Sequence, residues 1–424
     1  MKKNANKIKE IRINNLLIFL FLFNSIIDTI IMQYETRTTI ILLQYFSFIT
    51  VLVYFLLFKK IFFNKVYHLL FIIMVYYFLL SFLSTDYKMT FNYLAKFLIP
   101  FPFFIVGYSA IDTNEKYLDF TKKSFYILAY FVLYIIYCSI FSIGNRFYAG
   151  IAGNLRTGYM GLQGLYIPTF LIIQGLFFND YFRGKNKIIF NSLLVSSIIF
   201  FILIFKRTNI LLLGMGIASW LIFERKIKVR KKIVLLLLIF LSLIFAFRTE
   251  EFANVFKVRE SRFSAGYNVT QEGRYKENFF IWDKINDTPL TLLFGSGEVF
   301  NDIKTMSAEA DFVGSRGRQT HNSYARLLWS GGIMGLFFFL LFYFKIWQKI
   351  RKSYRRNSVV SSNFKKILVI WALVFIALRL INDFSSGITY ITFNAFFYTQ
   401  LGSLLRVIGN HRIKEDINEQ NHHI

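Results

Sequence analysis

Long apolar runs separated by short polar stretches extend along most of the chain. Most runs are close to the roughly 17–25 residues that a helix needs to cross a bilayer. We therefore predict an all-α fold, a polytopic membrane helix bundle with about 12 transmembrane helices. The predicted spans are 15–32, 38–58, 66–84, 91–111, 124–143, 163–178, 188–205, 208–223, 233–247, 326–344, 367–382 and 388–408.

One connection is much longer than the others. Residues 248–325 carry 10 Lys/Arg and 11 Asp/Glu, so the segment is close to neutral. A loop of this length is uncommon unless it is functional or disordered. Its patterned aromatic and aliphatic residues argue against disorder. We predict three parts in the chain: helices 1–9 in 1–247, a large extracytoplasmic loop in 248–325, and helices 10–12 with a cytoplasmic tail in 326–424.

Part of this loop has the pattern of an amphipathic helix. Apolar residues recur at helical spacing and predict a helix over 272–287, which Pro289 ends. The residues of the predicted apolar face are Tyr275, Phe279, Trp282 and Ile285. The glycine-containing segments 294–297 and 314–318 are typical of turns. The loop is thus predicted to be partly helical.

The distribution of charge supports a membrane protein and sets its orientation. The chain is 55% hydrophobic and 17% charged, with a formal net charge of +26. The basic residues lie in short clusters between apolar runs, which argues against nucleic acid as a partner. Every second connection is basic, so we place the N-terminus and the tail in the cytoplasm. The predicted location is the cytoplasmic (inner) membrane, with the active site on the extracytoplasmic face.

Several kinds of chemistry are absent from the sequence. It contains no G-x-x-x-x-G-K-[ST] motif, which excludes a P-loop ATPase. The predicted outer side has no Asp-x-Asp pair, which argues against a metal-dependent sugar-nucleotide transferase. His321 is the only histidine predicted there, so a histidine-based zinc site is excluded. The single cysteine, Cys138, allows no disulfide within the chain.

His321 and several arginines remain as candidates for chemistry on the outer side. A histidine with a pKa near neutrality is suited to removing a proton from a hydroxyl. Arginine binds phosphate oxygens through a bidentate fork and stays charged. The outer arginines are Arg156, Arg207, Arg274, Arg316 and Arg318. Together these residues indicate transfer of a group from a lipid-linked diphosphate to a hydroxyl.

The motifs around these residues resemble a known family. His321-Asn322-Ser323-Tyr324, followed by Gly332 and Gly335, resembles the H-N-x-Y and G-x-x-G signature of the O-antigen polymerase and ligase superfamily. Upstream, Gly273-Arg274, Trp282, Pro289 and 294–297 are similar to its Arg–Trp–Pro–Gly-x-Gly series. Lys206-Arg207-Thr208 is similar to its Ser-Arg-Thr/Gly element, with Lys206 in place of the usual Ser. The detailed resemblance covers residues 200–345.

This resemblance implies a membrane glycosyltransferase that needs no cofactor, metal or nucleotide sugar. Its donor would be an undecaprenyl-diphosphate-linked saccharide, held by Arg207 and Arg274. His321 would activate or position the acceptor hydroxyl. Secondary candidates for substrate contact are Arg156, Arg318, Asn322 and Tyr324. The expected partners are the lipid-linked oligosaccharide, the lipid bilayer, a chain-length regulator and a flippase.

Alternatives remain open at this stage. The first prediction is polymerisation of lipid-linked repeat units into a surface polysaccharide; a ligase that transfers finished polysaccharide to a lipid or cell-wall acceptor is the second. A transporter or flippase of lipid-linked sugar is a third, from a different class. Structural roles compete as well, because His321 is positioned to cap a helix and Arg207 to snorkel to the headgroups. Ionisable residues inside spans, namely Asp28, Lys96 and Arg379, indicate function by default; for Lys96 and Arg379 we favour snorkelling over extension of the phosphate site.

Overall fold

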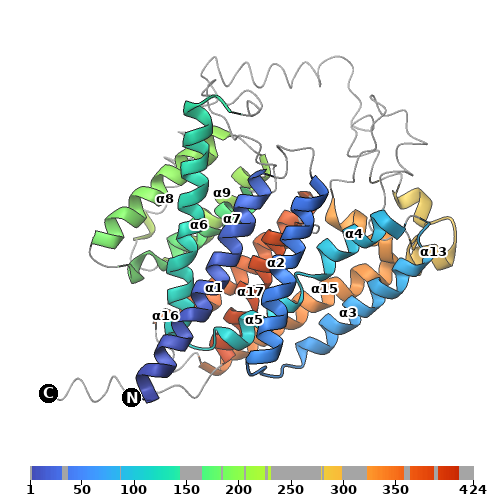
Figure 1. The fold of residues 1–424 in the computed structure, drawn as a ribbon, viewed down its shortest axis with the longest axis horizontal. Coiled ribbons are helices and arrows are strands. Elements are labelled where there is room, and N and C mark those ends of the chain that lie inside the picture. Colours follow the sequence, from blue (N-terminus) through green and yellow to red (C-terminus); the bar gives the residue numbers. More distant parts are fainter. Residues whose placement is uncertain are drawn as a thin grey trace.

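The computed structural model describes residues 2–30, 37–85, 87–143, 165–182, 185–204, 207–224, 228–230, 278, 281–297, 322–357, 363–385 and 390–409. Within these ranges the regular secondary structure is helical, without strands, which confirms the all-α prediction. The helices pack side by side into one bundle (Figure 1).

The first third of the chain supplies the N-terminal helices. They are α1 (Lys2–Ile30), α2 (Arg37–Phe58), α3 (Val66–Leu80) with η1 (Ser81–Leu83), α4 (Tyr87–Leu98), α5 (Pro102–Ala110) and α6 (Asn114–Ile140). The remaining described elements follow in chain order. Its elements are α7 (Tyr166–Phe178), η3 (Asn179–Tyr181), α8 (Lys185–Ile204), α9 (Arg207–Phe223), α13 (Pro289–Phe294), α15 (Ser323–Asn357), α16 (Asn363–Asn382), η5 (Asp383–Ser385) and α17 (Ile391–Gly409).

Five helical segments in the described part of the chain are long and apolar enough to cross a membrane. They are Thr39–Phe58, Val66–Leu83, Thr90–Ala110, Asn114–Ile140 and Ser323–Ser353. Shorter apolar helices cover Ile13–Thr29, Lys187–Phe201 and Thr208–Phe223. The span expected over 233–247 and most of the loop 248–325 lie outside the described residues. The count of 12 spans and the outer position of the loop therefore stay predictions.

The span predicted over 91–111 consists of two helices. Hydropathy runs through this region without interruption, but Pro100 and Pro102 lack the N–H groups that a continuous helix needs. The chain instead makes a tight turn, in which Phe103 N donates to Pro100 O at 3.1 Å. Pro102 then stands in the first turn of α5, where its fixed φ suits a helix start.

Helix α17 lies in the core of the bundle and is buried along almost its whole length. It contacts α1, α5, α6, α7, α15 and α16 (Figure 1). Two glycines bring it unusually close to α5. A Cβ added at Gly107 would lie 2.0 Å from Thr399 O, and one added at Gly402 would lie 2.1 Å from Phe104 O. Small residues at a helix crossing are the usual way for membrane helices to bring their backbones together.

A buried polar network holds four of these helices together. Gln174 on α7 exchanges side-chain hydrogen bonds of 3.3 and 3.4 Å with Gln400 on α17. The Gln174 amide also donates to Tyr117 on α6, and Trp371 on α16 donates to the same tyrosine hydroxyl at 3.1 Å. Each of these polar groups would be costly to bury without a partner, so the network favours one arrangement of the helices.

Candidate active site

The predicted outer loop rejoins the bundle at the start of α15, and its described part packs there. Ile281 and Ile285, spaced i, i+4, pack against Ala325 and Trp329, which have the same spacing on α15. Both isoleucines are buried, whereas Trp282 is 53% exposed. The helix at 281–285 was expected. Its face toward the bundle is centred on Ile281 and Ile285, however, and does not include Trp282; Tyr275 and Phe279 lie outside the described residues.

Pro289 ends the predicted helix and also begins a second helix, α13, which the sequence analysis did not predict. Thr288 and Thr291 form a reciprocal capping box at the start of α13, with Pro289 in its first turn. The predicted turn at 294–297 follows directly. Gly295 and Gly297 have φ values of +80° and +73°, a backbone region that only glycine adopts readily. The chain therefore turns back onto α15 at this point (Figure 1).

This turn fits against a break in α15. Gly332 has φ +59° and ψ −162°, so the helical hydrogen-bond ladder is interrupted there. The freed backbone carbonyls find other donors: Ser296 N and Oγ donate to Trp329 O at 2.8 and 2.9 Å, and Tyr76 OH donates to Gly331 O at 2.7 Å. Backbone groups at membrane depth need such partners. The 294–297 turn and the glycines at the start of α15, which are separate motifs in the sequence, form one structural unit.

Most of the predicted site residues are not among those that the structure describes. His321, Arg274, Arg156 and Arg318 lie outside the described residues. Arg207 begins α9, as expected, but its side chain is likewise outside the described part. The roles of these residues as base and phosphate ligands stay predictions.

Asn322 and Tyr324 are described, and both stabilise the start of α15. The Asn322 side-chain oxygen accepts from Tyr324 N at 3.0 Å, and its amide lies 3.5 Å from Asn278 Oδ1 on the loop. The Tyr324 hydroxyl donates to Leu380 O at 2.6 Å, and its ring packs against Phe384. Asn322 thus bridges loop and helix, and Tyr324 joins α15 to α16. These bonds hold the residue that follows His321 in a defined position.

Arg326 was not among the candidate residues predicted from the sequence. It is the described cation nearest to His321 along the chain. It lies one turn into α15, where its backbone N–H donates to Asn322 O at 3.1 Å. The side chain is 1% exposed, and its guanidinium lies 5.4 Å from the centre of the Tyr93 ring on α4. Lys96 Nζ lies 5.2 Å from the same ring. The sequence did contain a signal, because a cation inside a predicted span is expensive to bury.

A polar connection extends from these cations to the neighbouring helices. Gln44 on α2 donates to Asp28 on α1 and to Thr392 on α17, both at 2.9 Å. Lys96 is close enough to Asp28 for a favourable electrostatic interaction. Charged residues within a bundle usually face one another in this manner. The half-buried Lys96 therefore interacts with both the Asp28 carboxylate and the Tyr93 ring that Arg326 also contacts.

Arg379 does not snorkel, so that expectation is wrong. Its side chain is completely buried, and Nη2 forms an ion pair with Asp383 Oδ1 at 3.1 Å. The guanidinium also lies over the rings of Phe393 and Phe397, at 4.8 and 5.1 Å. Asp383 stands one turn further along, as the first residue of η5, and attracts the cation inward. Carboxylate and aromatic faces together replace the water that the guanidinium loses.

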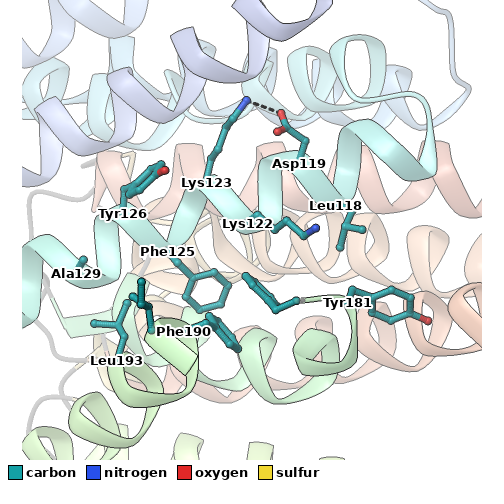
Figure 2. Close-up of a pocket in the computed structure, with 12 residues that line it drawn as sticks. Leu118, Asp119, Lys122, Lys123, Phe125, Tyr126, Ala129, Tyr181, Phe190 and Leu193 are labelled. Atoms are coloured by element: carbon teal, nitrogen blue, oxygen red, sulfur yellow. Dashed lines mark hydrogen bonds and ion pairs between the residues drawn. The ribbon is translucent and has the colours of Figure 1, made fainter. Parts of the chain in front are cut away.

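Two cavities lie among the described residues, and neither is lined by residues near the start of α15. The larger, of about 860 Å³, lies between α6, η3 and α8 (Figure 2). It is lined by Phe125, Phe190, Lys122 and Lys123, and Lys123 turns toward Asp119. The two lysines belong to a predicted cytoplasmic cluster, whereas His321 is predicted on the other side. On the predicted topology, this cavity and the candidate active site lie on opposite sides of the membrane.

The described residues contain no group of three or more His, Cys, Asp or Glu side chains suited to holding a metal ion. His321 and most of the loop lie outside the described residues. Metal independence accordingly stays a prediction, which rests on the sequence.

Comparison with known proteins bears on the family. No curated protein matches the chain. Residues 192–340 match the protein-family model described as O-Antigen ligase. This segment extends from α8 to the middle of α15 and includes Arg207, Arg274 and His321. The match supports an O-antigen polymerase- or ligase-type function, and it confirms the resemblance that the motifs indicated: over residues 192–340, the chain is similar to the O-antigen polymerase and ligase superfamily.

Proposed function

We propose that this protein polymerises undecaprenyl-diphosphate-linked oligosaccharide repeat units into a surface polysaccharide of O-antigen or capsule type. The observation that carries the proposal is the family match over 192–340. The matched segment includes His321 and every candidate arginine of the outer side except Arg156. The structural unit formed by the 294–297 turn and the α15 break adds support, because it fixes the start of α15 directly after His321.

The reaction follows from these residues. The hydroxyl oxygen of one repeat unit attacks the anomeric carbon of another, and the bond between that carbon and the diphosphate oxygen breaks. His321 takes the hydroxyl proton, which contributes about 10²–10⁴-fold to the rate. Arg207 and Arg274 neutralise the charge that develops on the departing lipid diphosphate. The energy comes from the donor bond, so the proposed reaction needs neither ATP nor a metal.

Arg326 is placed to assist in this scheme. It is a buried cation one turn from the start of α15, and helix N-termini carry a partial positive charge of their own. We assign it to the stabilisation of negative charge at this end of the helix, together with Lys96. Arg156 and Arg318 are proposed as further contacts to saccharide or phosphate.

A ligase is the second candidate, because the description of the matched family names that activity. It would use the same donor chemistry but transfer finished polysaccharide to a lipid or cell-wall acceptor. For either activity we propose the cytoplasmic membrane as the location, with the site on its outer face, and a flippase that delivers the donor. A chain-length regulator would accompany a polymerase.

His321→Ala tests the proposal and separates the two candidates. Cells with this variant should accumulate single lipid-linked repeat units, because donor synthesis and flipping do not depend on His321. The measurement is the length distribution of lipid-linked glycans, with His411→Ala as the control and immunoblotting to verify membrane insertion. Normal polymer in His321→Ala cells would refute the catalytic role. Full-length polymer retained on the lipid carrier would replace the polymerase assignment with the ligase.

A further inference from the structure

A second cavity, of about 520 Å³, lies in a groove between α3 and α15. Its polar lining consists mainly of lysines: Lys65 from the start of α3, and Lys345, Lys349 and Lys352 from the second half of α15. Three of these are exposed, whereas Lys349 is half-buried and donates to Asn64 Oδ1. The segments that provide the lysines, 59–68 and 341–357, contain no Asp or Glu. The groove is therefore strongly positive.

The apolar and basic parts of the groove are separated along its length. The two helices lie antiparallel, so Lys65 and Lys352 stand at the same end, while Ile72 and Leu341 lie about two helical turns or more further into the bundle. Lys65 directly precedes the candidate span Val66–Leu83, and Lys352 lies in the last turn of the span Ser323–Ser353. Lys65 and Lys352 thus stand at the limits of these candidate spans, and the apolar wall lies within them.

This arrangement matches the shape and charge of a phospholipid. A phosphate headgroup at the boundary would meet the ammonium groups of Lys65, Lys345 and Lys352. Its acyl chains would extend along Leu69, Ile72 and Leu341, and Ile72 is 45% exposed and available for such contact. Basic grooves between membrane helices bind anionic headgroups in this manner. A free anion would leave the apolar wall uncovered.

We propose that this groove is a specific site for an anionic phospholipid, with phosphatidylglycerol as the representative probe. The site lies at the end of the bundle opposite the start of α15, so it is separate from the proposed catalytic residues. A lipid bound there would hold α3 against α15. Helix α3 also supplies Tyr76, whose hydroxyl donates to Gly331 O at the break in α15. A bound lipid would therefore stabilise the helix pair that carries the candidate active site.

Native mass spectrometry of the purified full-length protein tests this proposal by titration with phosphatidylglycerol and phosphatidylcholine. The variant Lys65→Gln/Lys345→Gln/Lys352→Gln should lose affinity for phosphatidylglycerol by on the order of fivefold for each lysine. Binding of phosphatidylcholine should not change. The control Lys59→Gln/Lys60→Gln/Arg351→Gln removes the same charge at the same end without altering the groove. Equal affinity in the two triple variants would overturn the proposal.

Two further arms distinguish a lipid from a free anion. Ile72→Trp places a larger side chain in the apolar part of the groove without a change in charge, so it should weaken phosphatidylglycerol binding. Inorganic phosphate at millimolar concentration should not displace the lipid, because phosphate alone makes no contact with that wall. Undiminished binding in Ile72→Trp, or displacement by phosphate, would show a general anion site and refute the lipid assignment.

Discussion

Gly295 and Gly332 meet backbone to backbone, although 36 residues of chain separate them. A Cβ on Gly295 would lie 2.6 Å from Gly332 N, and a Cβ on Gly332 would lie 2.6 Å from Gly295 N and 2.4 Å from Leu293 O. Both residues have positive φ. Neither position has space for a side chain, so the glycines of the two sequence motifs are needed for one contact.

This contact leads to the first prediction. Gly332→Ala should separate the 294–297 turn from α15, since it introduces both strain, on the order of 1–3 kcal/mol, and a backbone clash. We expect a lower thermal unfolding temperature in detergent and loss of most polymer. Gly214→Ala is the matched control, because a Cβ at Gly214 meets nothing within 4 Å. Equal behaviour of the two variants would contradict the proposed contact.

The second prediction concerns the buried pair of Arg379 and Asp383. Asp383→Ala should destabilise the protein by roughly 3–5 kcal/mol, because it leaves a buried guanidinium without its carboxylate. Removal of both charges in Arg379→Met/Asp383→Leu should recover much of this loss. Chemical denaturation, or thermal unfolding in detergent, provides the measurement.

The pair of Asp119 and Lys123 provides the control for this experiment. It has the same i, i+4 spacing and a distance of 2.7 Å, but the side chains are 40% and 23% exposed. Water screens such a pair, and Asp119 keeps its hydrogen bond from Asn14 when Lys123 is removed, so Lys123→Ala should cost at most about 1 kcal/mol. A similar cost at both sites would show that Arg379 is hydrated in the membrane.

Within the described residues, hydropathy was sufficient to predict where most of the long apolar helices lie. The break between α4 and α5 was missed because Pro100 and Pro102 lie inside an apolar run that has the length of a single span. The prolines themselves carried the information, since each removes a backbone donor. The α15 break at Gly332 is harder to foresee, because it depends on donors from Ser296 and Tyr76, which are remote in sequence.

The candidate site was predictable in its motifs and much less so in its surroundings. The orientation of Arg379 was predicted incorrectly, because a cation near a helix end can turn either to the headgroups or inward. The deciding partner, Asp383, lies one turn away on the same chain segment. Arg326 was overlooked although it is five residues from His321. Its burial arises from the packing of α4 on α15, which spacing along one helix does not reveal.

The third prediction concerns topology. Since the basic connections alternate with poorly charged ones, 248–325 should be extracytoplasmic and the connection near Ser358 cytoplasmic. In a Cys138→Ala background, an impermeant thiol reagent should label Ser307→Cys but not Ser358→Cys in intact cells. Both should react after the membrane is permeabilised. Labelling of Ser358→Cys in intact cells would reverse the predicted orientation.

The fourth prediction concerns the source of energy and charge stabilisation. Purified protein supplied with lipid-linked repeat units should form polymer in the presence of EDTA and without ATP, because the donor diphosphate stores the required free energy. Chain length can be followed by gel electrophoresis. Loss of activity in EDTA, restored by Mg²⁺ or Mn²⁺, would refute stabilisation of the leaving group by arginines alone.

The last prediction concerns the arginines themselves. Arg207→Lys and Arg274→Lys retain a positive charge but lose the bidentate fork, so each should be strongly impaired if the side chain grips a diphosphate. Arg326 is expected to act through charge at the start of α15. There Arg326→Lys should retain substantial activity, whereas Arg326→Gln should lose on the order of 10²-fold. Initial rates of polymer formation provide the measurement, with Arg351→Gln, near the other end of the same helix, as the control.

These variants also separate a role in charge stabilisation from one in folding. Arg326 is buried against Tyr93, so a structural role would lower the unfolding temperature in Arg326→Gln and Arg326→Lys alike. A role in stabilising the leaving group would leave both variants about as stable as the unmodified protein, but different from each other in rate. The difference should change little with ionic strength, because salt screens buried charges much less than exposed ones. If Arg326→Gln retains the rate of the unmodified protein, the buried cation contributes only to packing, and Arg207 and Arg274 must hold the diphosphate without it.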